Sequence, residues 1–218
     1  MRICWLVGVL LAAGGLVAGE RARGAAPEAK ELAEKVIKRA GGEGKLLKLF
    51  RFRERVLITD KPAPAVKEDE PGNRTSVVEV GGDWWVNQAK RDKDKVRVLC
   101  WGWSLRVLLA PQSRVEVLPS GPIAGQPAVG LRVTGSIKEP LDLWFDGESH
   151  RLVAMDYDDT RHMFSEWKET AEGRAYPAHV VGCRFRDRAT KQLQDKQWYQ
   201  TDLLEVVELS ELPADLKR

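Results

Sequence analysis

Residues 125–168 decide the fold, and they read GQPAVGLRVTGSIKEPLDLWFDGESHRLVAMDYDDTRHMFSEWK. Residues 129–134 alternate apolar with other side chains, and residues 141–146 repeat this period of two, which is typical of strands with one buried face. Residues 152–157 and 162–167 predict two further strands, and short turns separate the four. Strands joined this closely pair antiparallel, so the stretch predicts a meander without a crossover helix.

Strand patterns continue outward from this meander. They cover residues 50–59, 74–80, 84–89, 115–118, 176–185 and 197–209. Residues 81–83 predict a hairpin turn, residues 60–73 a loop, and residues 119–122 a turn rich in proline and glycine. Residues 96–109 fit a strand at their start and a helix at their end, and the pattern leaves the two readings open. The sequence therefore predicts a mainly β fold of the α+β class, built on antiparallel pairing.

The clearest helix covers residues 27–40. Its apolar side chains fall on one stripe at helical spacing, Pro27 suits the first turn, and the pair Gly41-Gly42 ends it. Because the stripe is narrow and rich in alanine, we expect it to pack on the sheet rather than on a membrane.

The N-terminus reads as a secretory signal peptide over residues 1–25. A basic start is followed by an apolar run at residues 3–18 and then by small residues. The run is shorter than the roughly 20 residues of a membrane-spanning helix, and a retained anchor is the alternative. Cleavage after residues 17–19 or within residues 22–26 fits the pattern. We expect export to the periplasm or beyond, no stable membrane span after leader removal, and one domain over residues 27–218.

Charge patterning argues against nucleic acid as a partner. The 218 residues include 35 basic and 32 acidic ones, for a net charge of +3, and the two signs are interleaved. Interleaved charges give no sustained field for a phosphate backbone, so we predict no nucleic acid binding. Arg51, Arg53 and Arg55 share one face of a predicted strand. An anion site is one reading of them, and a solvated strand face is the reading we favour.

Cys100 and Cys183 are the cysteines of the predicted mature chain. Two cysteines in an exported protein can form a disulfide, but both stand in apolar settings, where a free thiol packs as a small hydrophobic group. We favour free thiols and keep the disulfide as the alternative. The sequence has no CxxC motif and no cluster of cysteine with histidine, so a structural zinc site is not expected.

Sequence motifs of catalysis and cofactor binding are absent, including the Gly-x-Ser-x-Gly elbow, the P-loop and the dinucleotide glycine motif. Asp156, Asp158 and Asp159 near His162 would suit a hard cation. Their spacing lacks the glycine and the terminal glutamate of a calcium loop, so we favour an exposed turn. We predict no cofactor, no metal and no catalysis, with a metal-dependent hydrolase as the remote alternative.

The order of short motifs resembles a known family. After the helix that ends at residues 41–43 come GQPAVG (residues 125–130), LWFD (143–146) and FSEWK (164–168), followed by Gly173 and Pro177. This order is similar to that of exported proteins related to the periplasmic lipoprotein carrier LolA, of the type abundant in planctomycete bacteria. The chain departs from the family pattern at Ser149-His150, where the pattern has Thr-Gly, and at Glu166-Trp167, where it has Asp-Tyr.

The resemblance implies a strongly curved antiparallel sheet, an incompletely closed barrel, with an N-terminal helix and one or two short helices over its open mouth. In the carrier, the apolar concavity holds acyl chains. The residues that contact the carrier's ligand do not match positions of this chain, so its lipoprotein traffic is not transferred here.

We therefore predict a non-enzymatic exported binding protein that holds an apolar, lipid-like ligand, such as an acyl chain, in the concave face of the sheet. Trp144, Met155 and Phe164 are the predicted wall residues, because they lie on central strands of the meander. Seven of the eight tryptophans follow the leader, and such side chains suit either a ligand pocket or a packed core. The alternative is an envelope structural or protein-interaction module, with an envelope protein as partner and a concavity filled by its own side chains.

Overall fold

The structure, a computed structural model, describes residues 21–65, 71–91 and 94–216. The predicted signal peptide lies outside the described residues as far as residue 20, and both its cleavage and the single domain over 27–218 stay predictions. Among the described residues, no helix combines the length and the apolar composition that a bilayer crossing requires.

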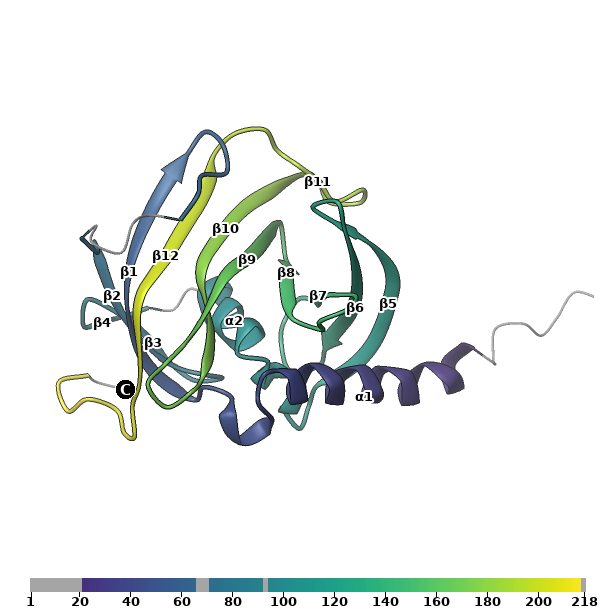
Figure 1. The fold of residues 1–218 in the computed structure, drawn as a ribbon, viewed down its shortest axis with the longest axis horizontal. Coiled ribbons are helices and arrows are strands. Elements are labelled where there is room, and N and C mark those ends of the chain that lie inside the picture. The colour runs from purple at the N-terminus through teal and green to yellow at the C-terminus, as the bar shows by residue number, and fades with distance from the viewer. Residues whose placement is uncertain (1–20, 66–70, 92–93, 217–218) are drawn as a thin grey trace, which may run out of the picture.

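Within these residues, twelve strands form one antiparallel sheet (Figure 1). The strands are β1 (Leu49–Thr59), β2 (Arg74–Glu79), β3 (Trp84–Val86), β4 (Ala89–Lys90), β5 (Arg114–Ile123), β6 (Gln126–Thr134), β7 (Leu141–Asp146), β8 (Leu152–Tyr157), β9 (Thr160–Glu169), β10 (Ala175–Asp187), β11 (Gln192–Leu193) and β12 (Trp198–Glu208). Their order is β4-β3-β2-β1-β12-β10-β9-β8-β7-β6-β5, with β11 paired to β10. The sheet curves strongly and does not close, because β4 and β5 remain its two edges. The predicted fold class, a curved antiparallel sheet that forms an incompletely closed barrel, is confirmed.

The meander of β6 to β9 follows directly from the alternation in its sequence. Leu141, Leu143 and Phe145 are fully buried and belong to the main core, which fills the concave side of the sheet. The side chains between them, including Asp142 and Trp144, therefore lie on the outer face. Each pair of neighbouring strands in the meander is antiparallel and in register over most of its length.

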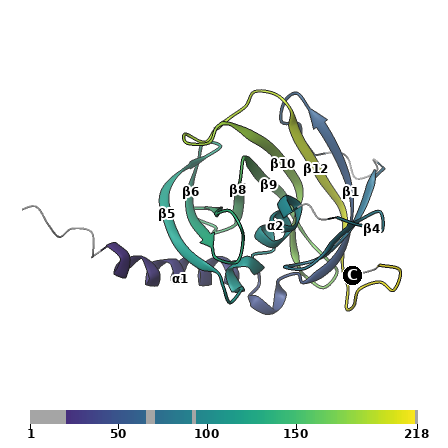
Figure 2. The ribbon, with the colours of Figure 1, turned by 180° about the vertical axis from the view of Figure 1, so that it is seen from behind.

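Two α-helices of the described residues meet the concave side (Figures 1 and 2). Helix α2 (Asp94–Trp103) lies inside the curve of the sheet, and helix α1 (Arg21–Arg39) runs across its open mouth beside β5 and β6. Short 3-10 helices, η1 (Glu43–Lys45) and η2 (Arg106–Leu109), follow α1 and α2. The open reading of residues 96–109 is thus settled as helix, because Val98, Cys100 and Trp103 all face the core.

The end of α1 has the geometry that its glycines predict. Gly41 and Gly42 have φ angles of 93° and 88°, and the N–H of Gly42 donates to the carbonyl of Ile37 at 2.9 Å. Such a left-handed C-terminal cap favours glycine. The start of α1 differs from the prediction, since the helix begins at Arg21 and Pro27 lies inside it. Arginine and alanine, which have high helix propensity, dominate the six residues before Pro27.

Two local predictions about strands are wrong. The predicted turn at residues 119–122 belongs to β5, whose pairing with β6 shifts in register between Leu118 and Gly121. Prolines fit there because β5 is an edge strand, where a missing N–H leaves no ladder bond broken. The predicted strand at residues 84–89 is split by Asn87 and Gln88, which both have positive φ angles and turn the chain into β4.

Both cysteines are free thiols, so the disulfide alternative is excluded. Cys100 lies on α2 within the main core, and Cys183 belongs to a small cluster with Val181 and Trp198. Val180 joins the main core and Val181 does not, which places Cys183 on the outer face of β10. The sheet therefore separates the two sulfurs.

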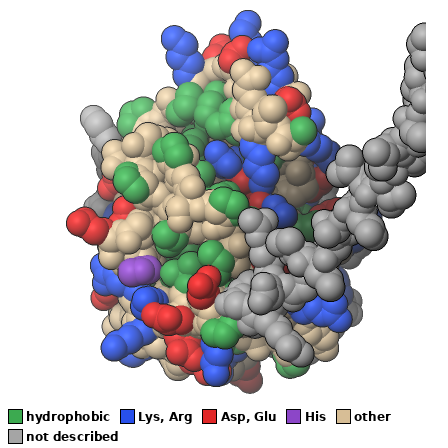
Figure 3. All heavy atoms as spheres, turned by 90° about the vertical axis from the view of Figure 1, so that its right-hand side faces the viewer, with side chains coloured by type: hydrophobic (Ala, Val, Ile, Leu, Met, Phe, Trp, Pro, Cys, Tyr) green, Lys and Arg blue, Asp and Glu red, His purple; other side chains and the backbone are tan. Residues whose placement is uncertain are grey.

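The surface carries both charge signs, as the sequence predicts. On the face shown in Figure 3, basic and acidic side chains are interspersed with hydrophobic ones. Arg51 and Arg53 are exposed on β1, and Arg53 lies 4.0 Å from Glu205, which agrees with a solvated strand face.

Candidate functional site

A cavity of about 190 Å³ lies between α2 and the concave face of the sheet. We call it the inner cavity, and most of its lining is apolar. Its wall is made by Phe52, Glu54, Val56, Arg74, Val96, Leu99, Cys100, Trp103, His162, Val180, Tyr199, Thr201 and Leu203. These residues come from α2 and from β1, β2, β9, β10 and β12, so the cavity lies on the side of α2 away from the meander of β6 to β8.

A buried carboxylate forms one polar part of the inner cavity. Glu54 is 1% exposed, and its two oxygens accept hydrogen bonds from Arg74 Nε at 2.6 Å and Nη2 at 2.9 Å. Ser76 Oγ donates to the same carboxylate at 2.7 Å. The bidentate guanidinium neutralises the charge of Glu54. Glu54 occupies the inward position between Phe52 and Val56. The alternation of β1 places residue 54 on the buried face, and this was the signal in the sequence that could have identified Glu54 as a buried carboxylate.

His162 and Cys100 line the same cavity and are held in their uncharged forms. Burial lowers the pKa of His162 to about 4, so the imidazole is neutral at pH 7. Its Nδ1 is buried without a hydrogen-bond partner among the described residues. Burial, together with the charge of Glu54, raises the pKa of the Cys100 thiol to about 12, so it is not a nucleophile at neutral pH.

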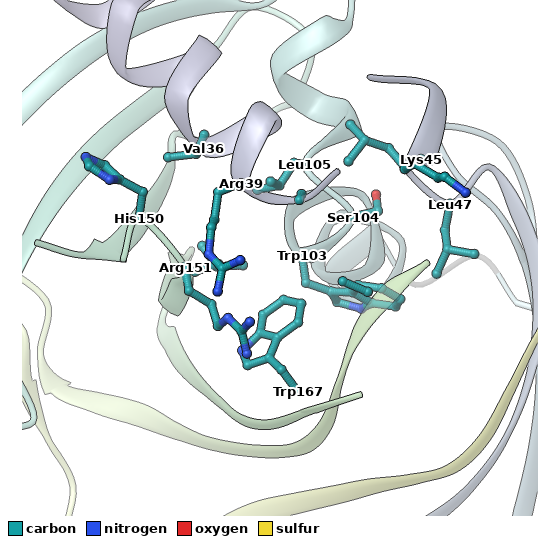
Figure 4. Close-up of a pocket in the computed structure, with 14 residues that line it drawn as sticks. Val36, Arg39, Lys45, Leu47, Trp103, Ser104, Leu105, His150, Arg151 and Trp167 are labelled. Carbon is teal, nitrogen blue, oxygen red and sulfur yellow. The ribbon is translucent and has the colours of Figure 1, made fainter. Parts of the chain in front are cut away.

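A second, smaller pocket opens where α1 crosses the mouth of the sheet (Figure 4). This mouth pocket has a volume of about 40 Å³. Its lining residues are Val36, Arg39, Ala40, Lys45, Leu46, Leu47, Trp103, Ser104, Leu105, His150, Arg151, Leu152, Trp167 and Ala175. Trp103, the last residue of α2, lines both this pocket and the inner cavity.

The turn between β7 and β8 brings two basic residues to the mouth pocket. Asp146 Oδ1 accepts hydrogen bonds from the N–H of Ser149 at 2.7 Å and from its hydroxyl at 2.6 Å. These bonds hold the pKa of Asp146 below its ordinary value and order the turn. His150 has a φ of 55°, a left-handed conformation that favours glycine, at the position where the family pattern has glycine. Arg151 follows it at the rim of the pocket.

The three predicted wall residues fall on two different faces. Met155 and Phe164 belong to the main core, whereas Trp144 packs in a smaller cluster on the outer face. Trp144 Nε1 donates to Asp156 at 3.2 Å. Met155 is fully buried against α2, and none of the three is among the lining residues of the inner cavity or the mouth pocket. Their role in ligand binding stays a prediction.

The predicted acidic turn is occupied by ion pairs. Asp156 accepts a hydrogen bond from Arg161 Nε at 2.6 Å, and Lys95 Nζ lies 2.7 Å from Asp158 and also bonds Asp159. His162 instead faces the inner cavity. Within the described residues, no group of three or more potential protein ligands is placed to hold a metal ion.

Comparison with known proteins gives a fold and no sequence match. No family model and no curated protein matches the chain. A putative outer membrane lipoprotein-sorting protein domain from Vibrio parahaemolyticus superimposes with a TM-score of 0.50 at 12% identity, covering 87% of this chain and 96% of that one. The chain shares the fold of that domain. A LolA superfamily protein from Nitrosomonas europaea gives a TM-score of 0.46 at 13% identity, over 85% of this chain and 94% of that one.

Proposed function

We propose that this chain is a non-enzymatic exported binding protein that holds an apolar, lipid-like ligand in the concave face of its sheet. The observation that carries the proposal is the inner cavity, an apolar space left open under α2. Where α2 faces β7 and β8, by contrast, the concave side is packed with fully buried side chains, such as Leu143 and Met155. Protein interiors are close-packed, so an apolar void of this size indicates a binding space.

The volume of the inner cavity sets how the ligand enters. An engineered apolar cavity of about 150 Å³ stays dry and binds benzene, whereas sites for larger ligands measure about 300–1,000 Å³. A cavity of about 190 Å³ therefore takes one end of an acyl chain as it stands. A whole chain requires α2 to move away from β1, β10 and β12.

The polar groups of the cavity support binding rather than catalysis. Glu54 is neutralised by Arg74, the Cys100 thiol is protonated and the His162 imidazole is neutral. A nucleophile activated by a neighbouring base requires a hydrogen bond between the two, and no such bond joins Cys100 to His162 among the described residues. These groups give the cavity limited polarity without a reactive pair.

Export and the class of ligand are part of this proposal. The solved domain with the same fold carries the name of a lipoprotein-sorting protein, and lipoproteins bear acyl chains. We infer an acyl-bearing ligand, while the planctomycete type of the chain and its periplasmic or extracellular location rest on the sequence. Fractionation of the producing cell tests export, and recovery of the protein from the cytoplasm alone would contradict it.

A second candidate function is a protein-interaction module with a self-filled core. It is favoured by the tight packing of α2 on β7 and β8, where a side chain at Gly102 would collide with Met155. In this case the inner cavity has no ligand, and a protein partner binds the outside of the sheet.

Titration with a fluorescent acyl probe separates the two candidates. We expect saturable binding by the parent protein and loss of binding in Val180→Phe, because the larger side chain fills the inner cavity. Val117→Phe is the matched control, since Val117 is exposed on edge strand β5. Absence of saturable binding to the parent, or equal binding by both variants, would favour the interaction module.

A further inference from the structure

We propose that the ligand is an anionic amphiphile whose headgroup binds at the mouth pocket between Arg39 and Arg151 and whose chain passes Trp103 into the inner cavity. This inference rests on the proposed function and names the chemical class of the ligand. Its headgroup is a carboxylate or a phosphate, which share a negative charge and oxygen acceptors that pair with guanidinium groups.

The charged side chains that line the mouth pocket are all basic. Arg39 reaches it from the last turn of α1 and Arg151 from the turn before β8, and Figure 4 shows the two guanidinium groups close together at its opening. Lys45 also lines the pocket, but its ammonium points away from the two arginines and donates to the carbonyl of Glu172 at 3.0 Å (Figure 4). None of the described lining residues is acidic. The ion pairs of α1 use Lys30 and Lys35, so Arg39 has no acidic partner among the described residues.

Uncompensated cations that converge on an apolar pocket favour an anion. Two guanidinium groups repel each other, and an anion between them converts this repulsion into two charge-assisted interactions. Arg39 and Arg151 are exposed, and exposed arginines often pair with a nearby carboxylate, which the described lining of this pocket does not offer. The Arg151 guanidinium here lies 5.7 Å from the centre of the Trp167 ring, which holds it over the pocket.

Trp167, which lies under Arg151, gives independent evidence that the mouth pocket lacks a hydrogen-bond acceptor. Trp167 Nε1 is buried and has no hydrogen-bond partner among the described residues. Buried indole N–H groups are normally paired with a hydrogen-bond acceptor. Trp167 lines the mouth pocket together with the two arginines. An oxygen-bearing headgroup provides both the negative charge and the acceptor that this pocket lacks.

The path of the chain follows from the position of Trp103. The mouth pocket alone, at about 40 Å³, has room for little more than a headgroup oxygen. The larger apolar space lies on the other side of Trp103, whose ring centre is 5.2 Å from that of Phe50. Leu105, two residues later, has a φ of 60° and ends α2 in a left-handed turn. Rotation of the Trp103 ring joins the two spaces into one channel with a charged mouth and an apolar end.

The test compares three twelve-carbon amphiphiles, each below its aggregation concentration: laurate, dodecyl phosphate and uncharged dodecanol. We expect the parent protein to bind one or both anions at least about tenfold more tightly than dodecanol, with the preference decreasing as salt is added. A preference for laurate identifies the headgroup as a carboxylate, and a preference for dodecyl phosphate identifies it as a phosphate.

The variants locate the headgroup site. Arg39→Gln with Arg151→Gln is expected to lose the preference for anions while binding dodecanol as the parent does. Arg114→Gln with Arg186→Gln, at exposed positions outside the mouth pocket, is the matched control and retains the preference. Unchanged thermal unfolding of both pairs shows that the fold is intact.

Equal binding of the three amphiphiles by the parent, or a preference that survives loss of Arg39 and Arg151, would overturn this inference and leave the proposed function standing. Failure of the parent to bind any of the three would overturn both.

Discussion

At the scale of single residues, two groups of the inner cavity, His162 and Cys100, are held in their uncharged forms. His162 is the clearest case, because burial lowers the pKa of its imidazole from an ordinary 6.5 to about 4. A neutral imidazole is compatible with an apolar ligand, whereas an imidazolium in the same place is not. The acid stability of the protein therefore reports on the polarity of this cavity.

The first prediction concerns pH and His162. In the unfolded chain His162 is protonated below about pH 6.5, whereas in the folded chain it is protonated only below about pH 4. The free energy of unfolding should therefore decrease as the pH falls through this window, by up to about 1.4 kcal/mol per pH unit. His162→Gln should flatten this part of the curve, as measured by urea unfolding at several pH values between 7 and 4.5.

His150→Gln is the control, because His150 lies at the rim of the mouth pocket rather than in the inner cavity. Carboxylates such as Asp156, whose pKa lies below 3.8, lose their contribution only at lower pH. A parent curve that keeps its slope after His162→Gln would show that this histidine is not buried as a neutral group.

At the scale of secondary structure elements, the packing of α2 on the meander depends on Gly102. A Cβ atom at this position would collide with the sulfur of Met155 and approach Leu141 and Leu143. Alanine has a higher helix propensity than glycine by about 1 kcal/mol, so propensity and packing predict opposite effects of substitution. The sign of the measured effect decides which of them positions α2.

We expect Gly102→Ala to destabilise the protein by about 1–3 kcal/mol, because overpacking outweighs propensity. In the background of Met155→Ala, which removes the colliding side chain, the same change should be neutral or stabilising. Gly44→Ala serves as the control, since a Cβ there meets open space. Chemical unfolding of the four variants gives the coupling, and a stabilising effect of Gly102→Ala alone would contradict the tight contact.

The hairpin that carries β11 is fixed to the outer face by Lys191. Its ammonium donates to Asp142 at 2.7 Å and to Asp156 at 2.8 Å, two carboxylates that face each other across β7 and β8. Burial alone would raise the pKa of Asp156, but hydrogen bonds and charge from Arg161 and Lys191 outweigh burial and lower it. Lys191 thus separates two buried negative charges.

Lys191→Met should lower the free energy of unfolding by about 1–3 kcal/mol at pH 7, because both carboxylates lose one ionic partner. Asp142 then keeps its bonds from Arg132, and Asp156 keeps those from Arg161 and Trp144. Lys196→Met, at an exposed position of the segment that follows β11, is the control. Thermal unfolding at pH 7 measures the effect, and equal stability of the two variants would contradict the role of Lys191.

At the scale of the whole molecule, the sheet could be predicted from the sequence better than its cavities. Alternation fixes which face of β7 enters the main core, and Gly41-Gly42 fixes the end of α1, because both are local properties. The prediction of a turn at residues 119–122 was wrong because proline ends a strand only where the backbone N–H of that position must form a ladder hydrogen bond. Edge strand β5 has a partner on one side only, so it tolerates proline. The helical nature of α2 was undecided because its residues are buried on several sides.

The candidate site could be predicted only in part, for a related reason. The location of the site on the concave face follows from the curvature of the sheet. The inner cavity itself depends on the position at which α2 packs, and no local sequence pattern predicts that position. Glu54 was missed because it interrupts an apolar stripe, and its partner Arg74 lies 20 residues away. The basic lining of the mouth pocket was missed because it combines Arg39 and Arg151, which are more than a hundred positions apart in the chain.

If the space under α2 holds an acyl-bearing ligand, native mass spectrometry of the protein, recovered without detergent from the cell that produces it, detects this ligand as added mass. We expect a bound fraction with the added mass of an acyl lipid, which Val180→Phe removes and Val117→Phe retains. A parent protein that appears only at the mass of its polypeptide, and stays so after incubation with laurate and dodecanol, would contradict this expectation.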